Sequence, residues 1–200
     1  MTCPSRETWR VSDLGISLLG GAGAASLGVA MTAIWEMYRH RRDMWERELS
    51  LVRACLVELE ANRLALRENI MVVEEEIDKI AKSEGRVVSP LDPVDTSAFD
   101  LLVLAQPAPL RGEGMAALLV MRRATRAVTE AARGREGWHL QGTSIPRFYP
   151  VLQLHDETVI RLCGEALDAL PAAEERLEQA RDELERKLNF ERKFDEAGAL

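Results

Sequence analysis

Residues 45–80 read WERELSLVRACLVELEANRLALRENIMVVEEEIDKI, and the apolar side chains in this stretch recur every seven residues. One column of the repeat holds Trp45, Val52, Leu59, Leu66, Val73 and Ile80, and the other holds Leu49, Leu56, Ile70 and Ile77. Only Arg63 interrupts the second column. A repeat of this length predicts a helix that packs against a partner helix with a left-handed crossing. The partner is either another helix of the same chain, in a four-helix bundle, or the same helix of a second copy.

Upstream of the repeat, twenty-two residues without a charge lie between Asp13 and Glu36. A helix of that length covers roughly 33 Å, and the hydrocarbon core of a bilayer is about 30 Å thick. We therefore expect one transmembrane helix over residues 14–38. No proline or glycine lies between Met31 and Ser83, so this helix should continue without a break into the heptad helix over residues 39–82. A cleaved signal peptide is disfavoured, because the positive charges follow the apolar run instead of preceding it.

The distribution of arginine predicts the orientation of the span. Arg6 and Arg10 precede it, and a larger basic group follows it: Arg39, Arg41, Arg42, Arg47 and Arg53. Positive residues accumulate on the cytoplasmic side, so residues 1–13 should be extracytoplasmic and the rest cytoplasmic, in a cell (inner) membrane. The anchors at the membrane interface should be Trp35, Tyr38, Arg39, Arg41 and Arg42.

Small residues recur every four positions within the span, at Gly20, Ala24 and Gly28. In lipid, close approach of two backbones must drive helix association, and small residues permit that approach. The spacing favours self-association of the membrane helix. With Leu49, Val52, Leu56 and Leu59 of the heptad helix, these residues are our candidates for homo-oligomer assembly.

The remaining chain, residues 83–200, should add two shorter helices and one long C-terminal helix. Ser97 can cap a helix over 97–105 with Asp100 as partner, and Pro107 and Pro109 should stop it. A helix over 113–133 should end at Gly134, followed by a loop up to Pro146, and Pro150 can open a last helix over 150–195. Pro171 should kink or divide that helix. No segment alternates like a strand, so the predicted fold is all-α.

Charge and cysteine content narrow the function classes. The chain carries a net charge of −7, with an arginine-rich middle and an acidic C-terminal part, which argues against general nucleic-acid binding. The middle arginines, including Arg122 and Arg126, should pair with the acidic last helix or, less favoured, meet anionic headgroups. Three scattered cysteines and three histidines form no metal-ligand spacing, so no metal or cofactor is expected. Cys55 and Cys163 should be reduced, buried residues.

One pair of residues suggests chemistry. Arg133 lies six residues before His139, between two predicted helices, which is similar to the spacing of the HEPN ribonuclease family. That resemblance implies a composite site in which arginine stabilises phosphate charge and histidine exchanges a proton. It covers two residues and lacks the polar residue that usually follows the arginine.

Together these features predict a membrane protein that is not an enzyme. We expect a single-pass, membrane-anchored helical protein that forms a homo-oligomer and serves as a scaffold, anchor or sensor subunit for a protein partner that the sequence does not identify. An oligomeric pore-forming effector is the first alternative, and a membrane-tethered ribonuclease using Arg133 and His139 is the second.

Overall fold

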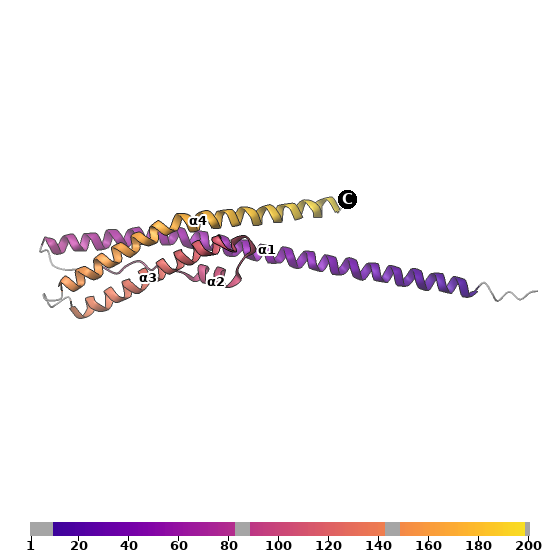
Figure 1. Cartoon of the computed structure of the whole chain (residues 1–200), viewed down its shortest axis with the longest axis horizontal. Coiled ribbons are helices and arrows are strands. Elements are labelled where there is room, and N and C mark those ends of the chain that lie inside the picture. The colour runs from indigo at the N-terminus through magenta and orange to yellow at the C-terminus, as the bar shows by residue number, and fades with distance from the viewer. Residues whose placement is uncertain (1–9, 83–88, 143–148, 199–200) are drawn as a thin grey trace, which may run out of the picture. The chain divides into compact units, whose positions relative to one another are not determined.

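The computed structural model describes residues 10–82, 89–142 and 149–198, and within these ranges the structure is entirely helical apart from connections. Its elements are α1 (Arg10–Ala81), α2 (Ser97–Ala105), the short 3-10 helix η1 (Ala108–Leu110), α3 (Glu113–Gly142) and α4 (Tyr149–Gly198), labelled in Figure 1. The predicted all-α class is confirmed. The chain divides into two compact units, Met1–Met44 and Trp45–Leu200.

In the second unit, three long helical segments lie side by side (Figure 1). Contacts between side chains fix their directions. Arg53 contacts Glu185 at 2.9 Å, and Arg63 contacts Glu174 at 2.5 Å, so α4 runs antiparallel to α1. Within the α3–α4 pair, Glu113 contacts Arg176 at 3.2 Å. Because the start of α3 thus lies beside the middle of α4, and residue 135 lies beside residue 156, α3 is antiparallel to α4 and parallel to α1.

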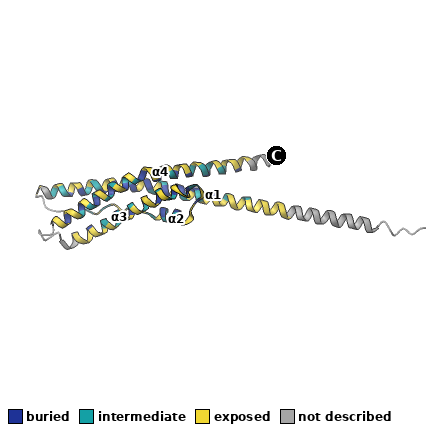
Figure 2. Cartoon of the chain, viewed as in Figure 1, coloured by how far each residue is buried: buried dark blue, intermediate teal, exposed yellow. Residues whose placement is uncertain are grey.

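The core of this bundle follows seven-residue repeats on α1 and α4. On α1, Val52, Leu59, Leu66 and Val73 are each 1% exposed or less. On α4, a buried column of alanines alternates with a buried column of leucines: Ala166, Ala173 and Ala180 with Leu170, Leu177 and Leu184. Small side chains in one column let neighbouring helices approach closely, while the leucines fill the space between them. In Figure 2 the buried residues gather where α1, α3 and α4 lie side by side.

One expected helix end is wrong. Helix α3 continues to Gly142, whereas the sequence predicts a loop after Gly134. Glycine at 134 and 137 costs helix stability, but tertiary contacts on the extra turns offset that cost. Arg135 is completely buried, and the Trp138 ring stacks on His155 with 5.8 Å between centroids.

Pro171 does not divide the last helix, which runs unbroken from Tyr149 to Gly198 with the proline inside it. The Pro171 side chain is exposed, whereas Leu170 and Ala173 on either side are buried in the core. Packing on both sides of the proline therefore maintains the helix despite the missing N–H group. Pro150 lies in the first turn of α4, as expected.

The described residues of the first unit, 10–44, all belong to helix α1. Among the residues whose side chains are described, we find no helical stretch with both the length and the apolar character needed to cross a bilayer. The side chains of residues 10–28 lie outside the described part, including those of Gly20, Ala24 and Gly28.

Candidate functional site

A column of three polar side chains on α1 binds the backbone of the chain that follows this helix. Asn62, Asn69 and Glu76, spaced seven residues apart, are 2%, 1% and 3% exposed, and we call them the polar column. The Asn62 amide donates to the Asp95 carbonyl at 2.7 Å and accepts from the Asp95 N–H at 3.0 Å. Asn69 makes the same pair of bonds to Asp92, at 3.0 Å and 2.6 Å. Each asparagine amide thereby hydrogen-bonds both the backbone N–H and the backbone carbonyl of one aspartate.

The polar column and its partner match in length. Residues 89–96, the extended segment, have no regular secondary structure. Seven helical residues rise about 10.5 Å, and three extended residues span about 10 Å. Ser89, Asp92 and Asp95 are three residues apart and meet the polar column in reverse order, so the extended segment runs antiparallel to α1. Pro90 and Pro93, which have no N–H to donate, occupy positions between these contacts.

The other side of the extended segment faces the bundle. Leu91 and Val94 are partly buried and pack against the core. The Thr129 hydroxyl donates to the Val94 carbonyl at 3.4 Å. The segment is therefore held by apolar contacts on one side and by the polar column on the other.

A buried ionic cluster closes the end of the polar column. Glu76 accepts from the Ser89 N–H at 2.5 Å and pairs through its other oxygen with Arg135 of α3. Arg135 is 0% exposed, and it also contacts Asp156 of α4 at 2.9 Å and donates to the Ser89 carbonyl at 3.1 Å. One guanidinium therefore joins three helices and the extended segment. A buried arginine requires this number of partners, because the desolvated charge is costly when it is unpaired.

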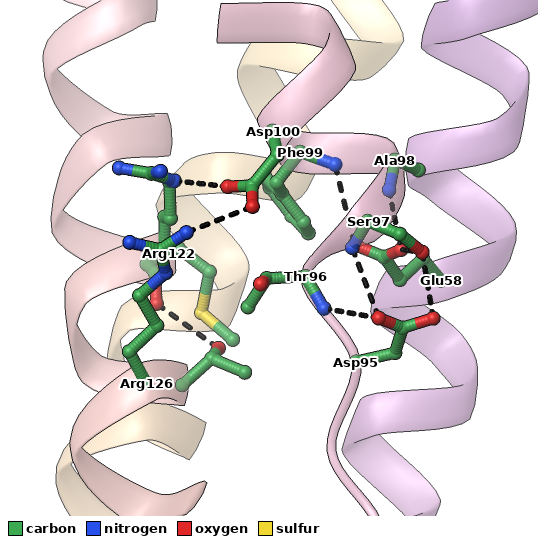
Figure 3. Close-up of polar contacts among 11 residues, drawn as sticks. Glu58, Asp95, Thr96, Ser97, Ala98, Phe99, Asp100, Arg122 and Arg126 are labelled. Atoms are coloured by element: carbon green, nitrogen blue, oxygen red, sulfur yellow. Dashed lines mark hydrogen bonds and ion pairs between the residues drawn. The ribbon is translucent and has the colours of Figure 1, made fainter. Parts of the chain in front are cut away.

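At the other end of the extended segment, α2 is capped by a carboxylate from a different helix (Figure 3). Glu58 of α1 accepts from the N–H groups of Ala98 and Phe99 at 2.7 and 3.3 Å. Asp95 accepts from Thr96 and Ser97 at 2.7 and 3.0 Å. The expected cap by Ser97 is wrong, since its hydroxyl hydrogen-bonds the Asp95 carboxylate at 2.7 Å instead. A negative charge at the start of a helix also interacts favourably with the helix dipole.

Two middle arginines have a partner that the sequence did not suggest. Arg122 and Arg126 of α3 both pair with Asp100 of α2, the latter at 2.8 Å (Figure 3). These bonds hold the pKa of Asp100 below its usual value, chiefly through the hydrogen bond from Arg122. The expected pairing of these two arginines with the last helix is wrong.

Another carboxylate of α1, that of Glu48, is partly buried. Burial raises the pKa of Glu48, and nearby Lys187 and a hydrogen bond from the backbone of Ala108 oppose the shift. Lys187 also lies over the Trp45 ring, 5.8 Å from its centroid.

The four heptad residues proposed for assembly lie in the core of the chain itself. Val52 and Leu59 are fully buried, Leu49 is 7% exposed, and Leu56 is partly buried. Of the two partners left open by the sequence, the intramolecular one accounts for this burial. In the first unit, Trp35 is 58% exposed and stacks on Tyr38 at 6.0 Å. Arg39 and Arg41 are exposed, and Arg42 is partly exposed.

Arg133 and His139 lie on one continuous helix instead of flanking a loop. Six residues correspond to a rotation of about 240° around a helix, so the two residues are on different sides of α3. Arg133 is exposed and lines a small cleft of about 260 Å³ beside the extended segment, with Asp92 and Glu136. The His139 side chain lies outside the described residues. Among described side chains, no group of three metal-ligand residues gathers.

Sequence reasoning missed the polar column and the buried arginine. The signal was present: Cys55, Asn62, Asn69 and Glu76 are seven residues apart, in step with the apolar columns beside them. In comparisons with known proteins, no family model, no curated protein and no solved structure matches this chain.

Proposed function

We propose that this chain is a single-pass, membrane-anchored scaffold or accessory subunit that holds a self-contained helical bundle at the cytoplasmic face of a cell membrane and works as a homo-oligomer. The anchor in this proposal is the helix over residues 14–38, with its N-terminus outside. The anchor holds the bundle at the membrane, and the bundle carries the surfaces that bind other proteins.

The observation that carries the proposal is the way apolar side chains are distributed on α1 before the bundle. Val29, Met31, Ile34, Trp35 and Met37 are between 58% and 72% exposed. At 100° per residue they are spread over about 240° of the helix circumference. A helix docked in a protein groove shows one apolar face, whereas an apolar surface on most sides is typical of a helix in lipid. The basic residues 39–42 follow at once, as expected at a cytoplasmic boundary.

The bundle supports the scaffold part of the proposal. Its heptad stripe is satisfied within the chain, and its polar interior is hydrogen-bonded by the extended segment. Such a unit needs no partner to complete its core, so its outer faces remain available for recognition.

Alkaline extraction of membranes tests the anchor. The full chain should remain in the membrane pellet, and replacing both Leu19 and Leu27 by arginine should move most of it to the supernatant, because two charges within the hydrocarbon core are costly. Leu104→Arg is the matched control, since Leu104 is an 80% exposed leucine on α2. A wild-type chain released by alkali would refute the membrane anchor.

The orientation is tested with the native thiol at Cys3. A membrane-impermeant maleimide added to intact cells should label Cys3. Cys55 and Cys163 should stay unlabelled, because burial raises their pKa values to about 12 and about 11. Cys3→Ser is the control and should abolish labelling. Labelling that requires permeabilised cells would place the N-terminus inside.

Self-association through the membrane helix is tested in detergent. The Gly20→Leu, Gly28→Leu double variant should form smaller assemblies than wild type, because leucine prevents close backbone approach. Leu18→Ala is the control. Unchanged assembly mass would exclude this face as an interface.

A further inference from the structure

Helix α1 carries a second heptad stripe, on its outer side. Val57, Leu64 and Met71 are seven residues apart and are 72%, 60% and 55% exposed. Positions three residues before them, Ala54, Ala61 and Glu68, are exposed as well. We call these six residues the outer stripe. Their alternating spacing of three and four residues is that of a helix seam, but no described residue of the chain covers it.

We propose that a second copy of this chain packs on the outer stripe, with the two α1 helices running in opposite directions. The inference rests on the homo-oligomeric part of the proposed function. Because the two α1 helices run in opposite directions, this pair is an alternative to self-association through Gly20, Ala24 and Gly28, and the two contacts cannot join the same two chains. A single register, centred between residues 62 and 63, satisfies both the size and the charge of the facing residues.

The size argument comes from the core layers of this register. Ala61 faces the partner's Leu64, and Ala54 faces the partner's Met71. Each large side chain therefore meets a small one, which allows close packing of antiparallel helices. The twofold axis repeats every layer, so the stripe is complementary to itself. The layer between these two pairs Glu68 with the partner's Val57, so the acidic side chain faces no like charge.

The charge argument comes from the flanking positions Arg53, Glu60, Arg67 and Glu74, which alternate in sign every seven residues. In the proposed register Glu60 meets the partner's Arg67, and Arg53 meets the partner's Glu74. Further out, Arg47 meets the partner's Asp78. Every pair is of opposite sign, and each occurs twice.

These side chains are available for such pairs. Neither Arg67 nor Glu74 forms an ion pair with any residue that the structure describes. Arg53 and Glu60 have exposed contacts with Glu185 and Arg63 within the chain. Asp78 has an exposed contact with Lys82. Exposed pairs are worth little, so exchanging them for contacts with the partner costs little.

The competing arrangements bring like charges together. A shift of seven residues in one direction places Glu60 against the partner's Glu60 and Arg53 against the partner's Arg67. A shift in the other direction places Arg67 against the partner's Arg67. A parallel pair places Glu68, Glu75 and Asp78 each against its own copy. Because like charges at facing positions are destabilising, the alternating signs select the antiparallel register.

In this register Trp45 of one copy lies beside residue 80 of the other. The two N-terminal segments therefore leave the pair at opposite ends, about 50 Å apart along the helix axis. This separation gives a direct way to distinguish antiparallel from parallel pairing.

Disulfide trapping of the full chain in mild detergent tests the register, with Cys3→Ser as background. The Ala54→Cys, Met71→Cys double variant should form a covalent dimer on oxidation, because the two positions face each other across the pair. Either single variant should yield at least about tenfold less dimer, since its two thiols lie about 25 Å apart along the axis, beyond disulfide reach. Dimer from a single variant would indicate a parallel pair, and no dimer from the double variant would overturn the interface.

A charge exchange provides the second test. Arg67→Glu should weaken dimerisation at least about tenfold, because it creates two like-charged contacts per dimer. Adding Glu60→Arg should restore the affinity to within about threefold by reversing both signs. Arg123→Glu, an exposed arginine on α3, should have no effect. Failure of the double exchange to restore dimerisation would overturn the register. Alkaline extraction of the same variants should be unchanged, so loss of the dimer and loss of the anchor are separate results.

Discussion

Helix α1 presents two buried sides with the same seven-residue period and opposite chemistry. One side is apolar, with Leu59 and Leu66 packed in the core shared with α3 and α4. The other side is polar, with Asn62 and Asn69 bonded to the extended segment. A period of seven therefore identifies which positions of a helix are buried, and the side chains there determine whether a helix or an extended backbone covers them.

The largest expected effect tests the end of the polar side. Arg135→Met should destabilise the bundle by about 3–5 kcal/mol, because it leaves Glu76 and Asp156 buried without their cation. Denaturant unfolding measures the change. Arg133→Met, two residues earlier and exposed, should change stability by under about 0.5 kcal/mol. If Arg135→Met changed the free energy of unfolding as little as Arg133→Met, the buried cluster would contribute nothing to folding.

The apolar side should respond next. Leu66→Ala removes a fully buried side chain and should cost about 3 kcal/mol in the same unfolding measurement. Leu104→Ala, at an 80% exposed leucine, should be nearly neutral. A small cost at Leu66 would show that the core collapses around the cavity.

A substitution on the polar side that preserves size sharpens the comparison. Asn69→Leu leaves both backbone groups of Asp92 without partners and should cost about 2 kcal/mol. Hydrogen exchange at the Asp92 amide should accelerate in this variant before global unfolding. A stabilising Asn69→Leu would show that the polar column selects the path of the chain without adding stability.

The smallest effect concerns pH and the α2–α3 contact. The folded pKa of Asp100 is below the ordinary 3.8, so its ion pairs add stability above that pH, and this stability is lost as pH falls through the folded value. Asp100 is about one third exposed, and solvent screening limits the gain at pH 7 to under about 0.5 kcal/mol. Asp100→Asn should therefore lower stability slightly at pH 7 and converge with wild type in acid. A constant difference across this range would assign the effect to shape instead of charge.

The sequence predicted the apolar side of α1 but not its polar side. Leu59 and Leu66 stand out because apolar residues that recur with a regular period are typical of the buried face of a helix. Asparagine side chains are usually solvated. Only the seven-residue spacing of Asn62 and Asn69 from the buried Cys55 indicates that they are buried. Their partner is a backbone, which has no side-chain signature. The match between seven residues of the helix and three residues of the extended segment is visible only in the three-dimensional structure.

The end of α3 was mispredicted for a related reason. Gly134 is a local stop signal, but the contacts that carry the helix past it come from Glu76 and Asp156 on other helices. Local propensity is a weak prior, and a buried ionic contact far along the chain outweighs it. Pro171 is a second case, because its flanking residues are held in the core of the bundle.

The correspondence between seven helical and three extended residues has a consequence for how this chain tolerates mutation. A substitution at Pro90 or Leu91 leaves the spacing of the backbone contacts unchanged. Inserting or deleting one residue between Ser89 and Asp95 moves every later backbone group out of step with its asparagine. Among diverging homologues, this stretch should therefore accept amino-acid substitutions more readily than insertions or deletions.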